Sequence, residues 1–226
     1  MEPGPIILSL KLSAVTTVIL LLFCLPLAFV FSGLNRHFRS FLDALSFLPM
    51  VLPPTVLGFY LLILFSPYNF IGGFLKDSMG IGFVFNFWGM VIASFVFSFP
   101  LMLLPIKNGI ENIDRSLVEA SYTLGKSKLQ TLYHIILPNI KSYIALGVLT
   151  TFAHTMGEFG VVLMVGGNIP GETKVLSIAL FEKVEELDYA TAHAYSLVLI
   201  LTSLLIISVI VVLNSKMKKG ANYGFN

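Results

Sequence analysis

The segment Glu119–Pro138, EASYTLGKSKLQTLYHIILP, is a polar and charged stretch inside a strongly apolar chain. Of the 226 residues, 56% are hydrophobic and 12% are charged. Soluble domains carry about 25% charged residues, so this composition is typical of an integral membrane protein. Glu119–Pro138 is therefore expected to lie at a membrane surface, between apolar segments that cross the bilayer.

Five apolar runs flank this stretch, and each is long enough to span a membrane. About 20 helical residues, at about 1.5 Å per residue, cover a hydrocarbon core of about 30 Å. The predicted spans are Leu12–Phe31, Leu45–Phe65, Phe83–Leu104, Tyr143–Val165 and Ala194–Leu213. We therefore expect an all-α integral membrane fold of about five transmembrane helices, forming one domain over residues 1–226.

The basic residues indicate which loops face the cytoplasm, because cytoplasmic loops of membrane proteins are enriched in Lys and Arg. A minority fall on one predicted side, at Lys11, Lys76, Lys174 and Lys183. The majority fall on the other side, at Arg36, Arg39, Lys107, Arg115, Lys126, Lys128, Lys141, Lys216, Lys218 and Lys219. The N-terminus and loops 66–82 and 166–189 are thus predicted outside, and the C-terminus and residues 114–138 in the cytoplasm. Because these cations form no continuous stripe, nucleic acid is not an expected partner.

Three prolines lie at the start of the second predicted span, in the segment Leu48–Pro54, LPMVLPP. Proline removes a backbone donor and bends a helix, and spans tolerate it where neighbouring helices satisfy the freed carbonyl groups. The pattern predicts a kinked helix packed inside a bundle. Pro53 and Pro54 are candidates either for a simple packing hinge or for part of a gate.

We find no catalytic or metal-binding pattern in the sequence. Gly125, Lys126 and Ser127 form the end of a phosphate-binding loop, but Ala120 occupies the place of its first glycine and no strand precedes it. The four histidines lack metal-ligand spacing, and Cys24 is a single cysteine within an apolar run. The chain is therefore not expected to be an enzyme, to bind a metal or to need a cofactor.

Two capping-box patterns predict a pair of short helices within residues 114–138. Ser116 precedes Glu119 by three residues, and Ser127 precedes Gln130 by three. The turn between the two helices is expected at Gly125, and the end of the second helix at Pro138. This second helix carries an apolar stripe that suits either the lipid surface or a partner protein, and the periodicity leaves both alternatives open. The stripe consists of Leu129, Leu132, Tyr133 and Ile136.

The same stretch closely resembles the E-A-A…G…I-x-L-P loop of the importer permeases of the ATP-binding cassette superfamily, with Ser121 in place of the second alanine. In that family the loop is the coupling helix, which docks on a cytoplasmic ATPase subunit. The resemblance implies that this ATPase is a partner and that it, rather than this chain, binds ATP. Small residues at Ala120 and Gly125 would allow close approach of helices at the turn. The implied docking residues are Glu119, Ala120, Ser121, Gly125, Leu137 and Pro138.

Further stretches resemble the permeases of molybdate and tungstate importers over nearly the whole chain. They are Ser9–Lys11, Leu48–Pro54, Gly157–Gly160 and Gly167–Gly171 with Thr173. The G-E-F-G element of Gly157–Gly160 is also similar to sulfate and thiosulfate permeases. The resemblance implies a multi-pass protein of the cytoplasmic (inner) membrane, in contact with lipid, with an extracytoplasmic oxyanion-binding protein as partner. Because five helices enclose little room for a water-filled path, we also expect a homodimer.

Glu158 is an ionisable residue at predicted membrane depth, where such groups are costly and are functional candidates. His154, four residues earlier on the same predicted helix face, is its expected partner, although the related permeases tend to carry arginine there. Glu158 is a candidate either for gating and pore lining or for a contact between helices. The full set of translocation candidates is Pro53, Pro54, His154, Gly157, Glu158, Phe159 and Gly160.

The sequence thus predicts the membrane subunit of an importer for molybdate or tungstate, driven by ATP that a separate subunit hydrolyses. One alternative is the same machine carrying sulfate or thiosulfate. Another is a stand-alone secondary transporter, which would need coupling ions and charged sites within the membrane. The predicted spans contain no Arg, and no Lys beyond Lys11 at an edge, which disfavours that second alternative.

Overall fold

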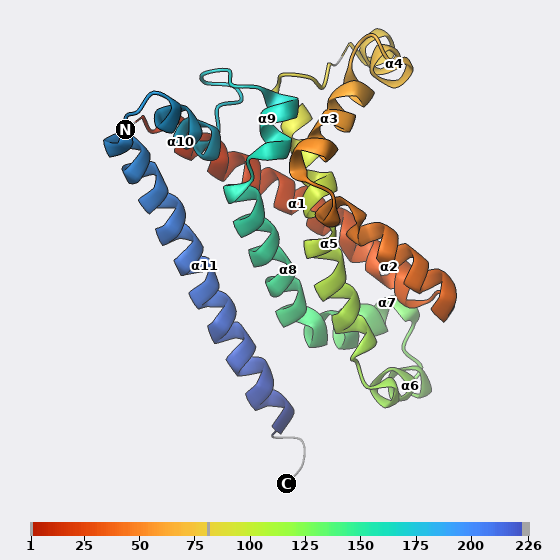
Figure 1. Cartoon of the computed structure of the whole chain (residues 1–226). Helices are drawn as coiled ribbons and strands as arrows, with labels where there is room; N and C mark the ends of the chain where they lie inside the picture. The colour runs from red at the N-terminus through yellow and green to blue at the C-terminus, as the bar shows by residue number, and fades with distance from the viewer. Residues whose placement is uncertain (1, 81, 223–226) are drawn as a thin grey trace.

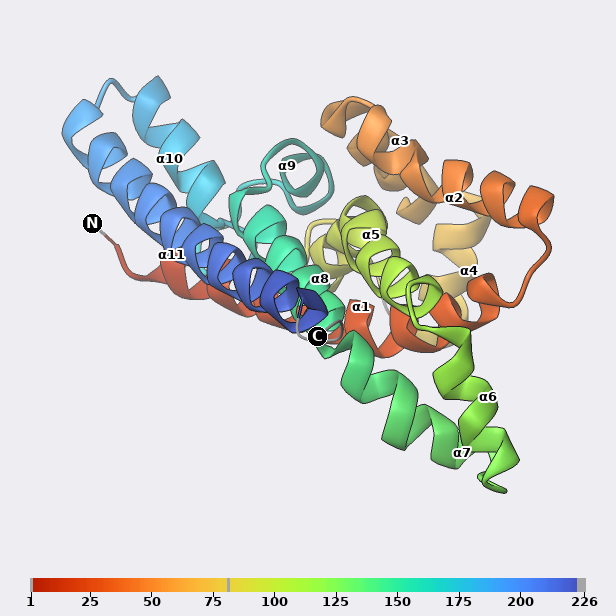
Figure 2. The same ribbon diagram turned by 90° about the horizontal axis from the view of Figure 1, so that it is seen from below.

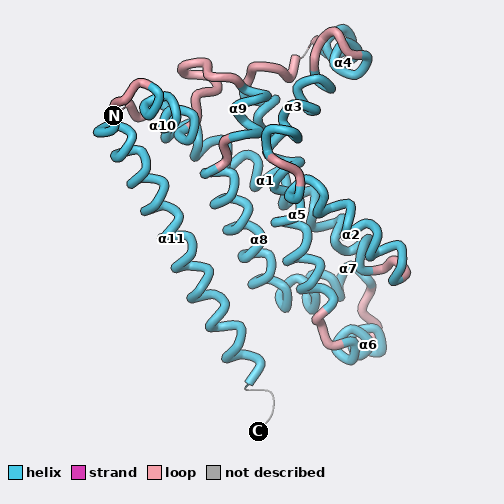
Figure 3. Tube along the Cα trace, viewed as in Figure 1, coloured by secondary structure: helices cyan, strands magenta, loops and turns pink. Residues whose placement is uncertain are grey.

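The computed structural model describes residues 2–80 and 82–222, which form helices and connecting loops without a strand (Figure 1 and Figure 3). In chain order the elements are α1 (Gly4–Ser32), α2 (Arg36–Val51), α3 (Pro54–Phe65), α4 (Phe70–Met79), α5 (Phe87–Glu111), α6 (Arg115–Thr123), α7 (Lys128–Thr131), the π-helical turn η1 (Leu132–Ile136), α8 (Leu137–Gly157), α9 (Gly160–Gly166), α10 (Leu176–Glu185) and α11 (Tyr189–Asn222). Within the described residues, 4 helical segments are long and apolar enough to cross a membrane, and the bent pair α2–α3 raises the possible spans to 5. The expected all-α membrane fold is confirmed.

The centre of the bundle is formed by α1, α5 and α8, which pack against one another. Leu20 and Cys24 of α1 belong to one buried cluster with Met102 of α5 and Ile140 of α8. Helices in lipid associate through close van der Waals packing, because lipid chains are as apolar as their side chains. At Gly147 of α8 a Cβ atom would lie 3.2 Å from the Met102 carbonyl oxygen, so a small residue there lets α8 approach α5.

The two ends of the bundle correspond to the two predicted sides of the membrane. Figure 1 shows the N-terminus, α4, α9 and α10 at one end, and the hairpin of α6 and α7 at the other. Figure 2 shows α11 along the outside of the bundle, where it packs against α8 and α10. This arrangement agrees with the predicted topology, in which the N-terminus lies outside and residues 114–138 lie in the cytoplasm.

Two of the predicted spans are broken rather than continuous. The prediction of one kinked helix over Leu45–Phe65 is wrong, because α2 and α3 meet at an angle of 100°. Leu52 has an extended backbone with ψ 141°, as expected for a residue before proline, and the consecutive Pro53 and Pro54 cannot continue α2. The predicted span Tyr143–Val165 is also interrupted, between α8 and α9, although no proline lies at that break.

The predicted loops outside the membrane contain helices that their polar and glycine-rich sequences concealed. Residues 66–82 include α4, which begins where the Asn69 side chain accepts a hydrogen bond from the Ile71 amide and ends at Gly80 with φ 66°. Residues 166–189 include α10. The predicted span Phe83–Leu104 is displaced along the chain, because the Asn86 side chain caps α5 at its beginning and the helix continues to Glu111.

Candidate functional site

The two helix breaks meet in the middle of the structure. Pro54 begins α3 and Gly160 begins α9, and these two short helices pack along each other. A Cβ atom on Gly160 would lie 2.9 Å from the Pro54 Cβ atom, so the position has no room for a side chain. Further along the same contact, a Cβ atom on Gly58 would lie 2.8 Å from the Met164 Cβ atom. Glycines on both helices therefore make this crossing possible.

A cavity of about 610 Å³ lies beside the crossing. The residues that line it come from α3, α5, α8 and the α8–α9 break: Pro54, Thr55, Phe97, Ala153, His154, Gly157, Glu158, Phe159 and Gly160. The structure thus brings together six of the seven translocation candidates. The seventh, Pro53, is at the α2–α3 break as the residue before α3, but it does not line the cavity.

The α8–α9 break is fixed by a hydrogen bond from a third element. Glu158 has an extended backbone with ψ 132°, and Phe159 has φ −124°, so neither residue continues a helix. The Glu158 carbonyl oxygen accepts a hydrogen bond of 2.6 Å from the Ser177 hydroxyl of α10. Non-helical backbone at membrane depth needs such partners, because no bulk water is present to satisfy it. Ser177 was not among the sequence candidates, and no local pattern marks it.

The side chain of Glu158 is buried without a hydrogen-bond partner among the described residues. The residue is 5% exposed, and neither carboxyl oxygen forms a hydrogen bond within 3.5 Å. The buried Ser94 hydroxyl of α5 also forms no hydrogen bond with the described residues. An unsatisfied buried polar group costs about 1–3 kcal/mol in protein mutational data, so Glu158 is retained at a cost to stability.

The predicted pairing of His154 with Glu158 is wrong. Because α8 ends at Gly157, Glu158 does not occupy the helical position one turn after His154. The His154 Nδ1 atom instead lies 2.9 Å from the Ser98 hydroxyl of α5, and that hydroxyl lies 3.2 Å from the Thr155 hydroxyl. The imidazole ring also packs on Phe97, with a centroid distance of 4.9 Å. His154 therefore joins α8 to α5 while it lines the cavity.

The helical hairpin is confirmed, but the capping of its first helix differs from the prediction. Asp114, rather than Ser116, precedes α6 and accepts a hydrogen bond of 2.9 Å from the Ser116 amide. This bond lowers the pKa of the exposed Asp114 carboxyl group. The second capping box is confirmed, because Ser127 and Gln130 each accept a hydrogen bond from the other's amide, at 3.3 and 2.9 Å.

The two arms of the hairpin are joined by a buried pair of hydroxyl groups. Ser121 Oγ of α6 lies 2.8 Å from Thr131 Oγ1 of α7, and both residues are buried. Gly125 provides the turn with φ 76°, a backbone conformation that favours glycine. A Cβ atom there would have nothing within 4 Å, so the expected role of Gly125 in close helix approach is wrong. Thr131 was not among the residues predicted from the sequence.

The second arm of the hairpin continues directly into the membrane. The prediction that Pro138 ends this helix is wrong, because the chain passes from α7 through η1 into α8 as one segment over Lys128–Gly157. Pro138 lies in the first turn of α8, where a missing amide donor is tolerated. The Ile135 carbonyl oxygen accepts a hydrogen bond of 2.7 Å from the Asn139 side chain. The π-helical turn η1 thus accommodates Pro138, and the helical segment is not interrupted.

The outer surface of the hairpin is apolar and exposed. Large hydrophobic side chains on it are between 47% and 79% exposed: Leu117, Tyr122, Leu124, Leu129 and Tyr133. Glu119 and Ala120 are exposed on the same hairpin. Contiguous exposed apolar side chains with a polar rim mark surfaces that bind another protein or a membrane. Both alternatives from the sequence remain compatible with this surface.

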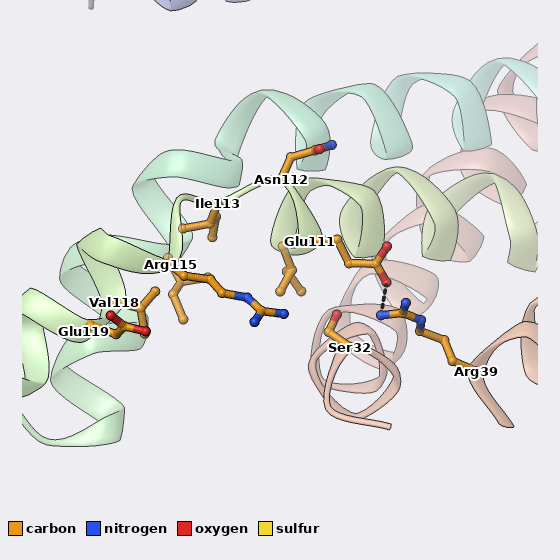
Figure 4. Close-up of a pocket in the computed structure, with 10 residues that line it drawn as sticks. Ser32, Arg39, Glu111, Asn112, Ile113, Arg115, Val118 and Glu119 are labelled. Atoms are coloured by element: carbon orange, nitrogen blue, oxygen red, sulfur yellow. Dashed lines mark ion pairs between the residues drawn. The ribbon is translucent and has the colours of Figure 1, made fainter. Parts of the chain in front are cut away.

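A second cavity, of about 680 Å³, separates the hairpin from the inner ends of the spans (Figure 4). It is lined by charged groups, among them Arg39 of α2, Glu111 of α5 and Arg115 and Glu119 of α6. Arg39 Nη1 lies 3.1 Å from Glu111 Oε1. The sequence marks Arg39 and Arg115 only as cytoplasmic cations, since ion pairs between distant segments leave no periodic signal.

Comparisons with known proteins agree on one family. The sequence model of the family described as "Binding-protein-dependent transport system inner membrane component" matches residues 24–219. The chain is 38% identical over 201 residues to "Molybdenum transport system permease protein ModB" of Azotobacter vinelandii, covering 88% of each protein. It is 33% identical over 194 residues to "Sulfate transport system permease protein CysT" of Salmonella typhimurium, covering 86% of this chain and 70% of the relative.

A solved structure supports the fold independently of close sequence identity. The chain aligns with a chain of the bacterial alginate ABC transporter in complex with an alginate pentasaccharide-bound periplasmic protein. The TM-score is 0.71 at 16% identity, and the alignment covers 96% of this chain and 78% of the other. This similarity shows only that the two chains arrange their helices alike.

Proposed function

Because the chain belongs to the family of binding-protein-dependent transport system inner membrane components, we propose that it carries molybdate across the inner membrane with energy from a separate ATPase. The observation that carries the proposal is the crossing of two broken helices, at Pro54 and Gly160, beside a cavity. Broken helices at membrane depth line paths for polar solutes in transporters. The name of the molybdenum permease that covers 88% of this chain supports molybdate as the solute.

The cavity is suited to releasing an oxyanion rather than holding it. Among the described residues that line it there is no Lys or Arg, and its polar groups include the Thr55 hydroxyl and the His154 ring. A carrier path must bind its solute weakly enough to let it leave. Specific recognition of molybdate is therefore assigned to an external oxyanion-binding protein, and this chain supplies the path.

Energy enters at the opposite end of the bundle. In this proposal the exposed apolar surface of the hairpin, with Glu119, Ala120 and Ser121, binds the cytoplasmic ATPase subunit. ATP is bound and hydrolysed only by that partner. Gly157, at the rim of the cavity, is exposed, so a second copy of the chain would close the path from that side. The proposed importer is thus a homodimer of permeases with two kinds of partner.

The proposal is tested by uptake into proteoliposomes that contain the permease, its ATPase and the binding protein. We expect ATP-dependent accumulation of labelled molybdate, reduced by excess tungstate and little affected by an equal excess of sulfate. Stronger competition by sulfate would contradict molybdate as the substrate and favour the sulfate alternative. That alternative is raised by the similarity to the sulfate permease. Uptake by the permease alone, without ATP, would contradict the importer and favour a secondary transporter.

A further inference from the structure

A network of four charged residues ties α2 to the inner end of α5. Lys107 Nζ contacts the Asp43 carboxylate and lies 3.7 Å from Glu111 Oε1, and Arg39 pairs with the same Glu111 atom at 3.1 Å. Arg39 and Asp43 belong to α2, while Lys107 and Glu111 belong to α5. The Glu111 carboxylate therefore pairs with two cations, Arg39 of α2 and Lys107 of α5.

Lys107 is the most buried residue of this network. Its side chain is 6% exposed, compared with 25% for Asp43 and 30% for Glu111. A buried ammonium group is strongly destabilising if it loses its partners, whereas exposed ion pairs contribute little. The pair of Lys107 with Asp43 therefore contributes most to the attachment of α2 to α5, and the more exposed pair of Arg39 with Glu111 adds to it.

The cavity between the network and the hairpin contains a further cation. Figure 4 shows the guanidinium group of Arg115 extending into this cavity toward Glu111 and Arg39. Within the described part of the chain Arg115 forms no ion pair. Arg115 is the first residue of α6, and only three residues separate it from Glu111 at the end of α5. A movement of the hairpin toward the spans would close the cavity and bring Arg115 to Glu111.

The other end of α2 reaches the proposed path. The helix runs from Arg36 to Val51, about 24 Å at about 1.5 Å per residue, and it is followed by the break at Pro53. Pro54 then contacts Gly160 beside the cavity that Glu158 lines. A shift of α2 at its Arg39 end is thus connected to the crossing of the two broken helices.

From these contacts we propose that Glu111 exchanges cations when the ATPase docks. In the structure described here it holds Arg39 and Lys107; when the hairpin moves inward, Arg115 takes its carboxylate and Arg39 is released, so that α2 loses one of its two ion pairs to α5 and keeps the Lys107–Asp43 pair. Arg115, Glu111 and Lys107 are then positioning residues that couple the hairpin to the helix crossing. This inference rests on the proposed function, since it requires a partner that moves the hairpin.

The test combines a distance measurement with transport. Spin labels are placed at the exposed Ser40 of α2 and Ser116 of α6, in a background where the buried Cys24 is replaced by Ala. In the permease alone we expect Glu111→Gln to broaden the Ser40–Ser116 distance distribution, and Arg115→Gln to leave it unchanged. Docking of the ATPase should shift the distribution of the unmodified network more than that of Arg115→Gln, because the hairpin moves in both and only the first gains the Arg115–Glu111 pair.

Uptake per ATP hydrolysed provides the functional readout. Coupling energies between sites correspond to changes of about 5–150-fold, so Arg115→Gln should lower this ratio at least about fivefold while the ATPase still binds. Arg115→Lys should restore most of it. Lys141→Gln is the matched control, because Lys141 is an exposed cation of α8 outside both the hairpin and the cavity lining.

Two results would overturn the exchange: an unchanged ratio in Arg115→Gln, or an unchanged distance distribution in Glu111→Gln. If the complex carries no oxyanion while Glu111→Gln still broadens the distances in the permease alone, the proposed function fails and the network stands. If the complex carries molybdate and Arg115→Gln matches Lys141→Gln, the importer stands and the exchange fails. The two proposals are thereby separated.

Discussion

Gly160 and Pro54 lie at the starts of two different helices, yet they meet so closely that a single added methyl group would lie 2.9 Å from the proline ring. The contact joins the break of one span to the break of another. It also places four consecutive residues, Gly157 to Gly160, along one wall of a cavity. The two glycines of this segment differ in the space around them: Gly160 is in tight contact with Pro54, whereas Gly157 faces open space.

We expect Gly160→Ala to destabilise the crossing and Gly157→Ala to be tolerated. Overpacking a tight contact costs about 1–3 kcal/mol, and the proline ring cannot move aside by rotating a side chain. A Cβ atom on Gly157 would have no atom within 4 Å. Thermal unfolding in detergent and uptake in proteoliposomes check the pair. Equal loss of stability in both variants would show that the contact with Pro54 does not explain why residue 160 is a glycine.

Glu158→Leu should raise the stability of the permease while it lowers uptake. The change removes a buried carboxyl group without a hydrogen-bond partner among the described residues, which relieves about 1–3 kcal/mol. It also removes a polar group from the cavity wall. The control is Glu158→Gln, which keeps the size and polarity of the side chain. A lower unfolding temperature in the Leu variant would show that the Glu158 carboxyl group has a stabilising partner.

Ser121→Ala should weaken the hairpin more than the combined Ser121→Ala and Thr131→Val change. The single variant leaves the buried Thr131 hydroxyl without its partner, which costs about 1–3 kcal/mol, whereas replacing both partners is nearly neutral. Unfolding measurements on the two single variants and the double variant give the interaction free energy. Additive effects would exclude a hydrogen bond between these side chains.

The stability of α6 should fall in acid because of Asp114. Its pKa is lowered in the folded state by the hydrogen bond from Ser116, so its contribution is fully present above the unfolded value of about 3.9 and is lost as the pH falls through the folded pKa. Hydrogen exchange of the α6 amides at decreasing pH measures the loss. Asp114→Asn should remove this dependence, while Ser116→Ala should keep the larger part, which comes from the backbone amide, and lose the part that comes from the hydroxyl. Retention of the acid dependence in Asp114→Asn would assign it to another group.

Apolar length and glycine or proline position were enough to predict the number of spans, their approximate places in the chain and the hairpin. These signals are local, because each depends on residues close together in the chain. The sequence also grouped Gly157–Gly160 with Pro54 as candidates, and the structure places them around one cavity. It did not predict how sharply the chain turns at Pro53, because proline marks a bend without fixing its angle.

Contacts between distant segments were not predictable in the same way. The bond from Ser177 to the Glu158 carbonyl and the ion pair of Arg39 with Glu111 join residues that no periodic pattern relates. The wrong pairing of His154 with Glu158 has the same origin. It assumed a continuous helix, and the helix ends between them.

The continuous helical segment Lys128–Gly157 joins the hairpin to the cavity. Its 30 residues measure about 45 Å along the helix at about 1.5 Å per residue. The segment works as a lever arm: a small tilt imposed at Lys128 becomes a displacement at Gly157, next to the cavity, after passing through η1. The η1 turn, Leu132–Ile136, is where this arm is least regular. The stiffness of those five residues therefore determines how much of a displacement of the hairpin is transmitted to the cavity.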